Sequence, residues 1–99
     1  MIKVEVTKKN ISILGHANYD EYGKDIVCAA VSTAVILSVE AISSFDEHAV
    51  DVKQSNDKLE VIINKYDKIT NKLIVNLLNC LKELEKKYPK NIKITNKEE

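Results

Sequence analysis

The sequence predicts an α+β domain in which two helices pack on one mostly antiparallel sheet, with the element order ββαββαβ. Residues 1–7 and 11–14 alternate apolar and polar side chains, which is typical of half-buried strands. Residues 24–45 and 67–88 carry apolar side chains at three- and four-residue spacings, which is typical of helices. A chain of 99 residues is long enough for a single domain with its own core, so we expect one domain over residues 1–99.

The first two strands are predicted to pair as a hairpin. The polar turn Lys8-Lys9-Asn10 separates them and contains no apolar residue. His16 follows the second strand directly and shares the parity of Ser12 and Leu14. We therefore expect its side chain just beyond one end of the sheet.

The next stretch, residues 17–22, has neither strand nor helix periodicity and is predicted to be a solvated loop. Gly15 and Gly23 are the only glycines of the chain, and both flank this loop. Glycine permits positive φ and hinge motion, so we expect loop hinges at these two positions. Tyr19 and Tyr22 either cover a bound substrate or pack on the surface, and the residue pattern leaves both readings open.

The first helix runs from Lys24 to about Phe45 and is apolar around most of its circumference. One face carries Ile26, Ala30, Ala34, Leu37 and Ala41, with Val27, Val31, Val35 and Ile42 beside it. A helix of this kind is expected to be buried on several sides. Asp25 is predicted as its N-cap, which makes Cys28 the third helical residue. The free N–H groups and the dipole at the helix start favour a thiolate at Cys28, whereas the negative charge of Asp25 disfavours it. The sequence does not show which of these two effects is larger.

The second half of the chain supplies the remaining elements. We expect a third strand at residues 48–53, with Val50 and Val52 pointing inward, and a fourth strand at residues 59–63. A second helix should follow from about Asp67 to Tyr88, and a last strand should lie at residues 92–94. Pro89 ends the second helix, because proline disfavours helical backbone in the preceding residue.

Charge and composition argue against several function classes. The formal net charge is zero and all 15 basic residues are lysine, so we expect no direct nucleic-acid partner. The longest apolar run, residues 26–39, is interrupted by polar side chains, so we expect no membrane span. Cys28 and Cys80 show no disulfide spacing, which favours a reducing cytoplasm.

The motif Gly15-His16-Ala17, a short loop and then Asp25-Ile26-Val27-Cys28-Ala29-Ala30-Val31-Ser32 resembles the bacterial ribosomal-processing cysteine proteases. That family removes a short N-terminal extension from a large-subunit ribosomal protein, the L twenty-seven protein. The resemblance implies that Cys28 is the nucleophile and His16 its partner, with Asp25 and Ser32 as supporting residues. It also implies a ribosomal-protein precursor as substrate and a homodimer. We expect no cofactor.

A purely structural role, without any part in catalysis, can also explain each of these residues. Cysteine in an apolar helix is commonly a small buried hydrophobe, and N-capping alone explains Asp25. Ser32 lies one turn beyond Cys28 and can hydrogen-bond either near the sulfur or to its own helix. Cys80 is predicted to be structural. A metal site made of His16, Cys28 and His48 lacks ligand spacing, so no metal is expected.

Two function classes therefore remain open. The first is a cysteine endopeptidase with a Cys28–His16 dyad. The second is a non-catalytic ribosome-associated protein that binds the same extension without cutting it. The reactivity of the Cys28 thiol compared with that of Cys80 distinguishes the two classes, because only a nucleophile needs to be activated.

Overall fold

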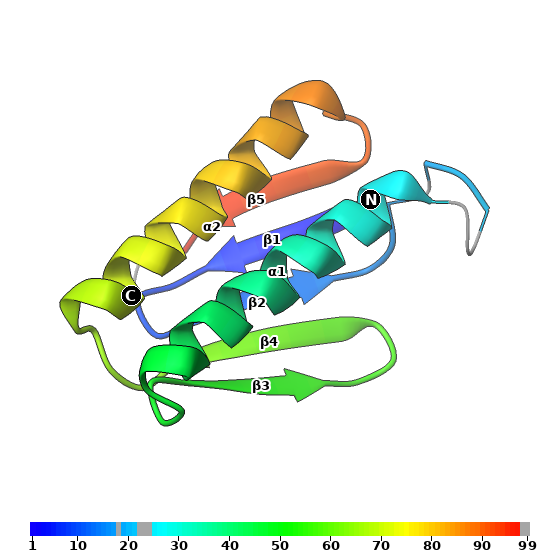
Figure 1. Cartoon of the computed structure of the whole chain (residues 1–99). Helices are drawn as coiled ribbons and strands as arrows, with labels where there is room; N and C mark the ends of the chain where they lie inside the picture. Colours follow the sequence, from blue (N-terminus) through cyan, green and yellow to red (C-terminus); the bar gives the residue numbers. More distant parts are fainter. Residues whose placement is uncertain (18, 22–24, 98–99) are drawn as a thin grey trace.

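The computed structural model describes residues 1–17, 19–21 and 25–97, and it places a layer of two helices on one face of a five-stranded sheet (Figure 1). The elements in chain order are β1 (Ile2–Val6), β2 (Asn10–Leu14), α1 (Ile26–Phe45), β3 (Val50–Gln54), β4 (Lys58–Ile63), α2 (Lys68–Lys87) and β5 (Ile92–Asn96). The strand order is β3-β4-β2-β1-β5, and only the β1–β5 pair is parallel. The predicted fold class and element order are confirmed.

The strand registers gather several loops at one end of the sheet. Leu14, the last residue of β2, pairs with Lys58, the first residue of β4. Ile2 pairs with Ile92 at the start of β1 and β5. The loop after β2, the β3–β4 turn and the start of α1 therefore meet at this end (Figure 1). The residues singled out by the sequence motif lie here.

Both helices begin at an aspartate that caps them. The Asp25 side chain accepts hydrogen bonds from the N–H groups of Val27 and Cys28, and Asp67 does the same for Thr70. The predicted N-cap of α1 is confirmed, and Cys28 is the third helical residue. The expected helix start at Lys24 lies outside the described residues, and α1 begins at Ile26.

The expectation that α1 is buried on several sides is wrong for the chain by itself. The buried residues of α1 are Val27, Val31, Val35 and Ile42. Four large apolar side chains on the helix are 53% to 68% exposed: Ile26, Ile36, Leu37 and Phe45. The sheet covers only one side of the helix layer, so the outer side of α1 is left open (Figure 1). Sequence periodicity counts apolar residues but does not tell which of them meet the sheet.

By length and composition, α1 would also be able to cross a membrane, since it has 20 residues and is strongly apolar. The polar side chains that interrupt the run therefore do not by themselves exclude a membrane span. Core helices of globular domains satisfy the same criteria, and the inner face of α1 belongs to the core of this domain.

The prediction that both valines of β3 point inward is confirmed for only one of them. Val50 is buried, whereas Val52 is 45% exposed. Strand β3 is an edge strand, and α1 lies over its first residues rather than its far half (Figure 1). The second valine therefore has no covering layer.

Candidate active site

Cys28 lies in the first turn of α1 and is half-buried. Asp25 Oδ1 accepts the N–H groups of Val27 and Cys28, each at 3.0 Å, and the Asp25 carbonyl accepts the Ala29 N–H at 3.1 Å. The donors that a helix start offers to an anion are therefore engaged by Asp25 at these positions. An anion that develops beside the Cys28 sulfur needs a donor from another segment.

Asp25 also ties the loop to the helix. Its second carboxylate oxygen, Oδ2, accepts the Tyr19 N–H at 3.0 Å. Burial by itself would raise the pKa of Asp25, but backbone hydrogen bonds from Cys28, Tyr19, Asp20 and Val27 outweigh it and lower the pKa below its ordinary value. The ionised carboxylate is the form that these contacts hold in place.

The substitution Asp25→Ala is expected to lower the free energy of unfolding by about 1 kcal/mol, because the cap acceptor is lost. The folded-state pKa of Asp25 is depressed, so its stabilisation is present above about pH 4 and disappears as the pH falls through the lowered pKa. Urea unfolding of both proteins at neutral and at acidic pH measures the effect. The difference between them should shrink on acidification.

Asp67→Ala is the matched control, because Asp67 caps α2 through the Thr70 N–H at 2.8 Å and takes no part in the loop. Asp67→Ala should lower the free energy of unfolding by a similar amount. It should leave the rate at which iodoacetamide alkylates Cys28 unchanged. An Asp25→Ala protein as stable as the wild type at neutral pH would contradict this role for the cap.

Ala17 connects the loop to the nucleophile candidate. Its N–H donates to Cys28 Sγ at 3.3 Å, and its carbonyl accepts a hydrogen bond from Asn91 Nδ2 at 3.0 Å. The residue is 1% exposed and belongs to the core. The prediction of a solvated loop over residues 17–22 is therefore wrong at Ala17, because the fold buries this position between the sheet end and α1.

Gly15 adopts a backbone conformation that only glycine takes readily. Its φ is +80°, and a Cβ atom there would lie 3.0 Å from the Met1 carbonyl oxygen. Its N–H donates to the Asp57 carbonyl at 2.9 Å. The chain turns sharply out of β2 at this residue. Gly23, the other expected hinge, lies outside the described residues.

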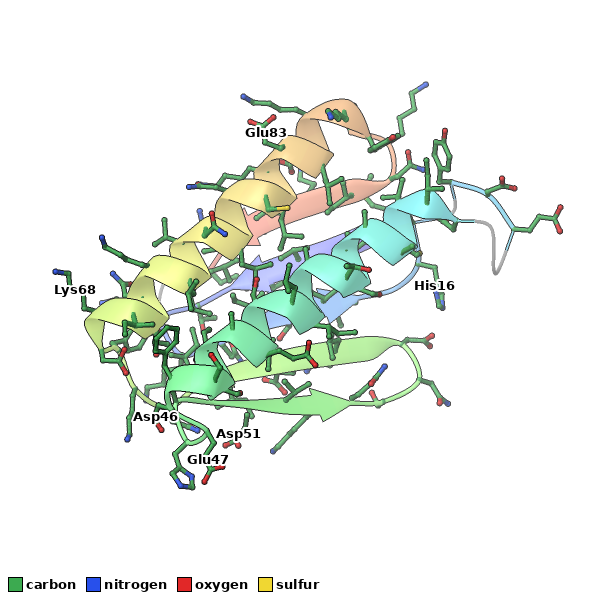
Figure 2. All side chains as sticks on the ribbon, viewed as in Figure 1. His16, Asp46, Glu47, Asp51, Lys68 and Glu83 are labelled. Atoms are coloured by element: carbon green, nitrogen blue, oxygen red, sulfur yellow. The ribbon has the colours of Figure 1, made fainter. Side chains whose placement is uncertain are left out.

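His16 projects from the loop toward the β3–β4 turn (Figure 2). Its Nε2 lies 3.2 Å from Asp57 Oδ1, and its side chain is 56% exposed. Within residues 1–17, 19–21 and 25–97, no hydrogen bond joins the His16 ring to the Cys28 thiol. The two residues are nevertheless neighbours through Ala17, the residue after His16 whose N–H contacts the sulfur.

Tyr19 packs on α2 at its C-terminal end. Its ring forms an edge-to-face contact with Tyr88, with 5.3 Å between centroids and 80° between planes. Tyr19 is still 47% exposed, so one side of it faces solvent beside the loop. Tyr22, the other expected substrate contact, lies outside the described residues.

Within the part of the chain that the structure describes, the remaining candidates make no hydrogen bond with this cluster. Ser32 is exposed one turn along α1 from Cys28. Cys80 is exposed on α2 and does not belong to the buried core, and its structural role stays a prediction. His48 is exposed and contacts Glu47 at 3.5 Å. Among the described residues, no group of three potential ligands is arranged to hold a metal ion.

Asp57 and Asn91 contact the candidate site, and sequence reasoning did not single them out. They lie 41 and 74 residues from their partners His16 and Ala17, so no local spacing connects them. Only the pairing of β2 with β4 and of β1 with β5 brings them to the loop.

A cavity of 410 Å³ lies away from these residues. It is lined mainly by apolar side chains from the β1–β2 turn and the first half of α2, including Ile74 and Leu78. Because α1 and α2 begin at opposite ends of the helix layer, the cavity lies far from Cys28 (Figure 1). It contributes nothing to the cluster around the thiol.

Comparison with known proteins shows which class of protein this chain resembles. The ribosomal processing cysteine protease Prp of Staphylococcus aureus is 28% identical over 106 residues, which cover 98% of this chain and 100% of that protein. Its structure with a covalently linked product peptide has a TM-score of 0.90 at 26% identity, covering 98% of this chain and 100% of that one. Its structure with a substrate peptide has a TM-score of 0.80 at 25% identity, with the same coverage.

The model of the family described as cysteine protease Prp matches residues 1–93, which include the loop, the start of α1 and the whole sheet except the end of β5. Members of this family are hydrolases of peptide bonds that act through a cysteine. The match over most of its length shows that this chain belongs to the Prp family of cysteine proteases.

Proposed function

We propose that this chain removes the N-terminal extension of the L twenty-seven ribosomal-protein precursor, with Cys28 as the nucleophile and His16 as its base. The names of the similar Staphylococcus aureus protein and structures support a processing role and a peptide substrate. The observation that carries the proposal is the contact from the Ala17 N–H to Cys28 Sγ, since it joins the sulfur to the segment that bears His16. Such a substrate implies a cytoplasmic reaction.

In the acylation step His16 takes the proton from the Cys28 thiol, and the thiolate attacks the carbonyl carbon of the scissile bond. The tetrahedral intermediate collapses as the C–N bond breaks, and the amine leaves with the proton that His16 returns. In the second step His16 takes a proton from a water molecule as its oxygen attacks the thioester carbonyl. The C–S bond then breaks, the acid is released, and the Cys28 thiolate takes the proton back from His16. Because catalytic contacts often tighten only in the substrate complex, the absence of a Cys28–His16 hydrogen bond in the free protein is compatible with this sequence.

The negative oxygen of the intermediate needs hydrogen-bond donors. Asp25 engages the N–H groups of Val27 and Cys28, so these are unsuitable while the cap holds. The Ala17 N–H already points at the sulfur at 3.3 Å. Once the sulfur forms a bond to the substrate carbon, this donor is close to the new oxyanion, and we assign it to the oxyanion site.

A cleavage assay tests the function directly. The wild-type chain, incubated with the L twenty-seven precursor of its own host, is expected to yield mature protein and intact extension as two new masses. A precursor with a scrambled extension is the control and should stay intact. Tight binding of the genuine precursor with no new mass would support the non-catalytic alternative and overturn the protease proposal.

We also propose that the chain forms a homodimer through the open face of α1. This face carries exposed Ile36 and Leu37, and the single charged residue of the helix is Glu40. A water-facing helix surface almost without charge is typical of a surface that another protein covers. The formal net charge of zero means that two copies do not repel one another.

Leu37→Glu is expected to convert this dimer into monomer at micromolar concentration, because a carboxylate buried without a partner costs several kcal/mol. Analytical ultracentrifugation measures the change. Ile69→Glu is the control, since Ile69 is 42% exposed on α2 and lies outside the α1 face. It should leave the mass unchanged. A monomeric wild type at the same concentration would refute the dimer.

A further inference from the structure

The β2–β4 pairing sets the position of Asp57 relative to the loop. Leu14 pairs with Lys58 in antiparallel strands, so Gly15, which follows β2, lies opposite Asp57, which precedes β4. The Gly15 N–H donates to the Asp57 carbonyl at 2.9 Å, which extends the ladder by one bond. The backbone of Asp57 is therefore anchored directly beside the residue that precedes His16, whatever its side chain does.

The Asp57 side chain makes its contact with His16. Its Oδ1 lies 3.2 Å from His16 Nε2, within hydrogen-bond distance. A carboxylate can only accept, so the contact requires a proton on Nε2. In neutral imidazole this leaves the lone pair on Nδ1.

With the proton on Nε2, Nδ1 is the nitrogen left to act as a base for Cys28. It is bonded to the ring carbon that carries the side-chain stem, so it stays closer to the backbone than Nε2 does. The Ala17 N–H, immediately after His16 in the chain, contacts Cys28 Sγ at 3.3 Å. With Nε2 held by Asp57, the nitrogen that keeps its lone pair is the one nearer the backbone, and the backbone directly after His16 contacts the sulfur.

We propose that Asp57 is the positioning residue of His16, which extends the Cys28–His16 dyad to a Cys28–His16–Asp57 arrangement. The inference rests on the proposed roles of Cys28 and His16. Asp57 selects the tautomer with the proton on Nε2, limits rotation of the ring, and stabilises the imidazolium that forms when His16 takes the thiol proton. Its side chain contacts His16, so it acts through the histidine.

The His16 and Asp57 side chains are both exposed, which allows a positioning role of Asp57 to be distinguished from a structural one. The side chains are 56% and 76% exposed, and an exposed pair of this kind contributes little to stability. Substitution of the carboxylate should therefore leave the melting temperature unchanged while altering catalysis. Glu47 and His48 form a similar exposed pair at 3.5 Å, away from Cys28, and supply a matched control.

The kinetic test compares Asp57→Asn, Asp57→Glu and Glu47→Gln in the precursor cleavage assay. Asp57→Asn keeps the size of the side chain and is expected to lower kcat about tenfold or more with little change in KM, since the imidazolium loses its counter-charge. Asp57→Glu should recover part of the loss, and Glu47→Gln should match the wild type. Wild-type or higher kcat in Asp57→Asn would overturn the proposal.

Nitrogen-15 NMR of the imidazole rings supplies a readout that does not depend on turnover. The chain has only two histidines, so His48 serves as an internal reference. Neutral His16 is expected in the Nε2–H form in the wild type, with a larger Nδ1–H fraction in Asp57→Asn and no change at His48. An unchanged His16 tautomer would overturn the proposal.

The variant His16→Ala distinguishes a failure of the Cys28–His16 dyad from a failure of the role proposed for Asp57. If His16→Ala is inactive while Asp57→Asn has full kcat, only the role of Asp57 is refuted. If His16→Ala cleaves normally, the dyad itself is refuted, and the role of Asp57 is refuted with it.

Discussion

Cys28→Ala is expected to lower cleavage of the ribosomal-protein precursor by at least about a thousandfold, because no other group replaces the nucleophile. The fold should survive, since alanine is a good helix former and the change removes one sulfur atom. The Ala17 N–H loses its acceptor, which predicts a modest fall in melting temperature rather than unfolding. Mass spectrometry of the digest and thermal unfolding measure the two effects.

Cys80→Ala is the matched control for this experiment. Cys80 is exposed on α2 and lies outside the loop cluster, so its removal should leave turnover unchanged. The Cys28→Ala protein should still bind the uncut extension in a titration, because recognition does not need the sulfur. Normal cleavage by Cys28→Ala would end the cysteine-protease mechanism proposed for this residue.

His16→Ala has the second largest expected effect. Loss of the base should reduce cleavage by about a hundredfold to ten-thousandfold. It should also slow alkylation of Cys28 by iodoacetamide at neutral pH, because the thiolate forms less readily without a proton acceptor. Cleavage rates and mass-spectrometric mapping of the alkylated cysteine measure both.

Two internal controls make the alkylation result unambiguous. In the wild type Cys28 should react faster than Cys80, although Cys80 is exposed and Cys28 is half-buried, so access alone predicts the opposite order. His48→Ala should change neither rate, because His48 contacts Glu47 at a distance from the thiol. Equal reactivity of the two cysteines would contradict an activated Cys28.

Local patterns in the sequence were sufficient for the elements and for the start of α1. Two-residue alternation predicts the strands, and three- and four-residue spacing predicts the helices, since these periods follow from backbone geometry. Asp25 was recognisable as an N-cap because capping involves residues only two or three positions away. The motif from Gly15 to Ser32 was likewise sufficient to suggest the protease family.

The same patterns were not sufficient to predict which side chains are buried. The α1 residues Ile26 and Leu37 were expected on a buried face, yet they are 53% and 66% exposed. Ala17 was expected in a solvated loop, yet it is buried. Burial depends on which side of a helix or loop meets the sheet, and that depends on how distant segments pack.

The sequence by itself determined the order of the elements, the cap at Asp25 and the motif that carries Cys28 and His16. Only the tertiary structure decided what surrounds these two side chains. The Ala17 N–H on the sulfur, the engagement of the helix-start donors by Asp25 and the Asp57 carboxylate on His16 all appear there for the first time. The physical reason is strand register: Asp57 reaches His16 across 41 residues because β4 pairs with β2, and such a non-local contact leaves no periodic trace in the chain.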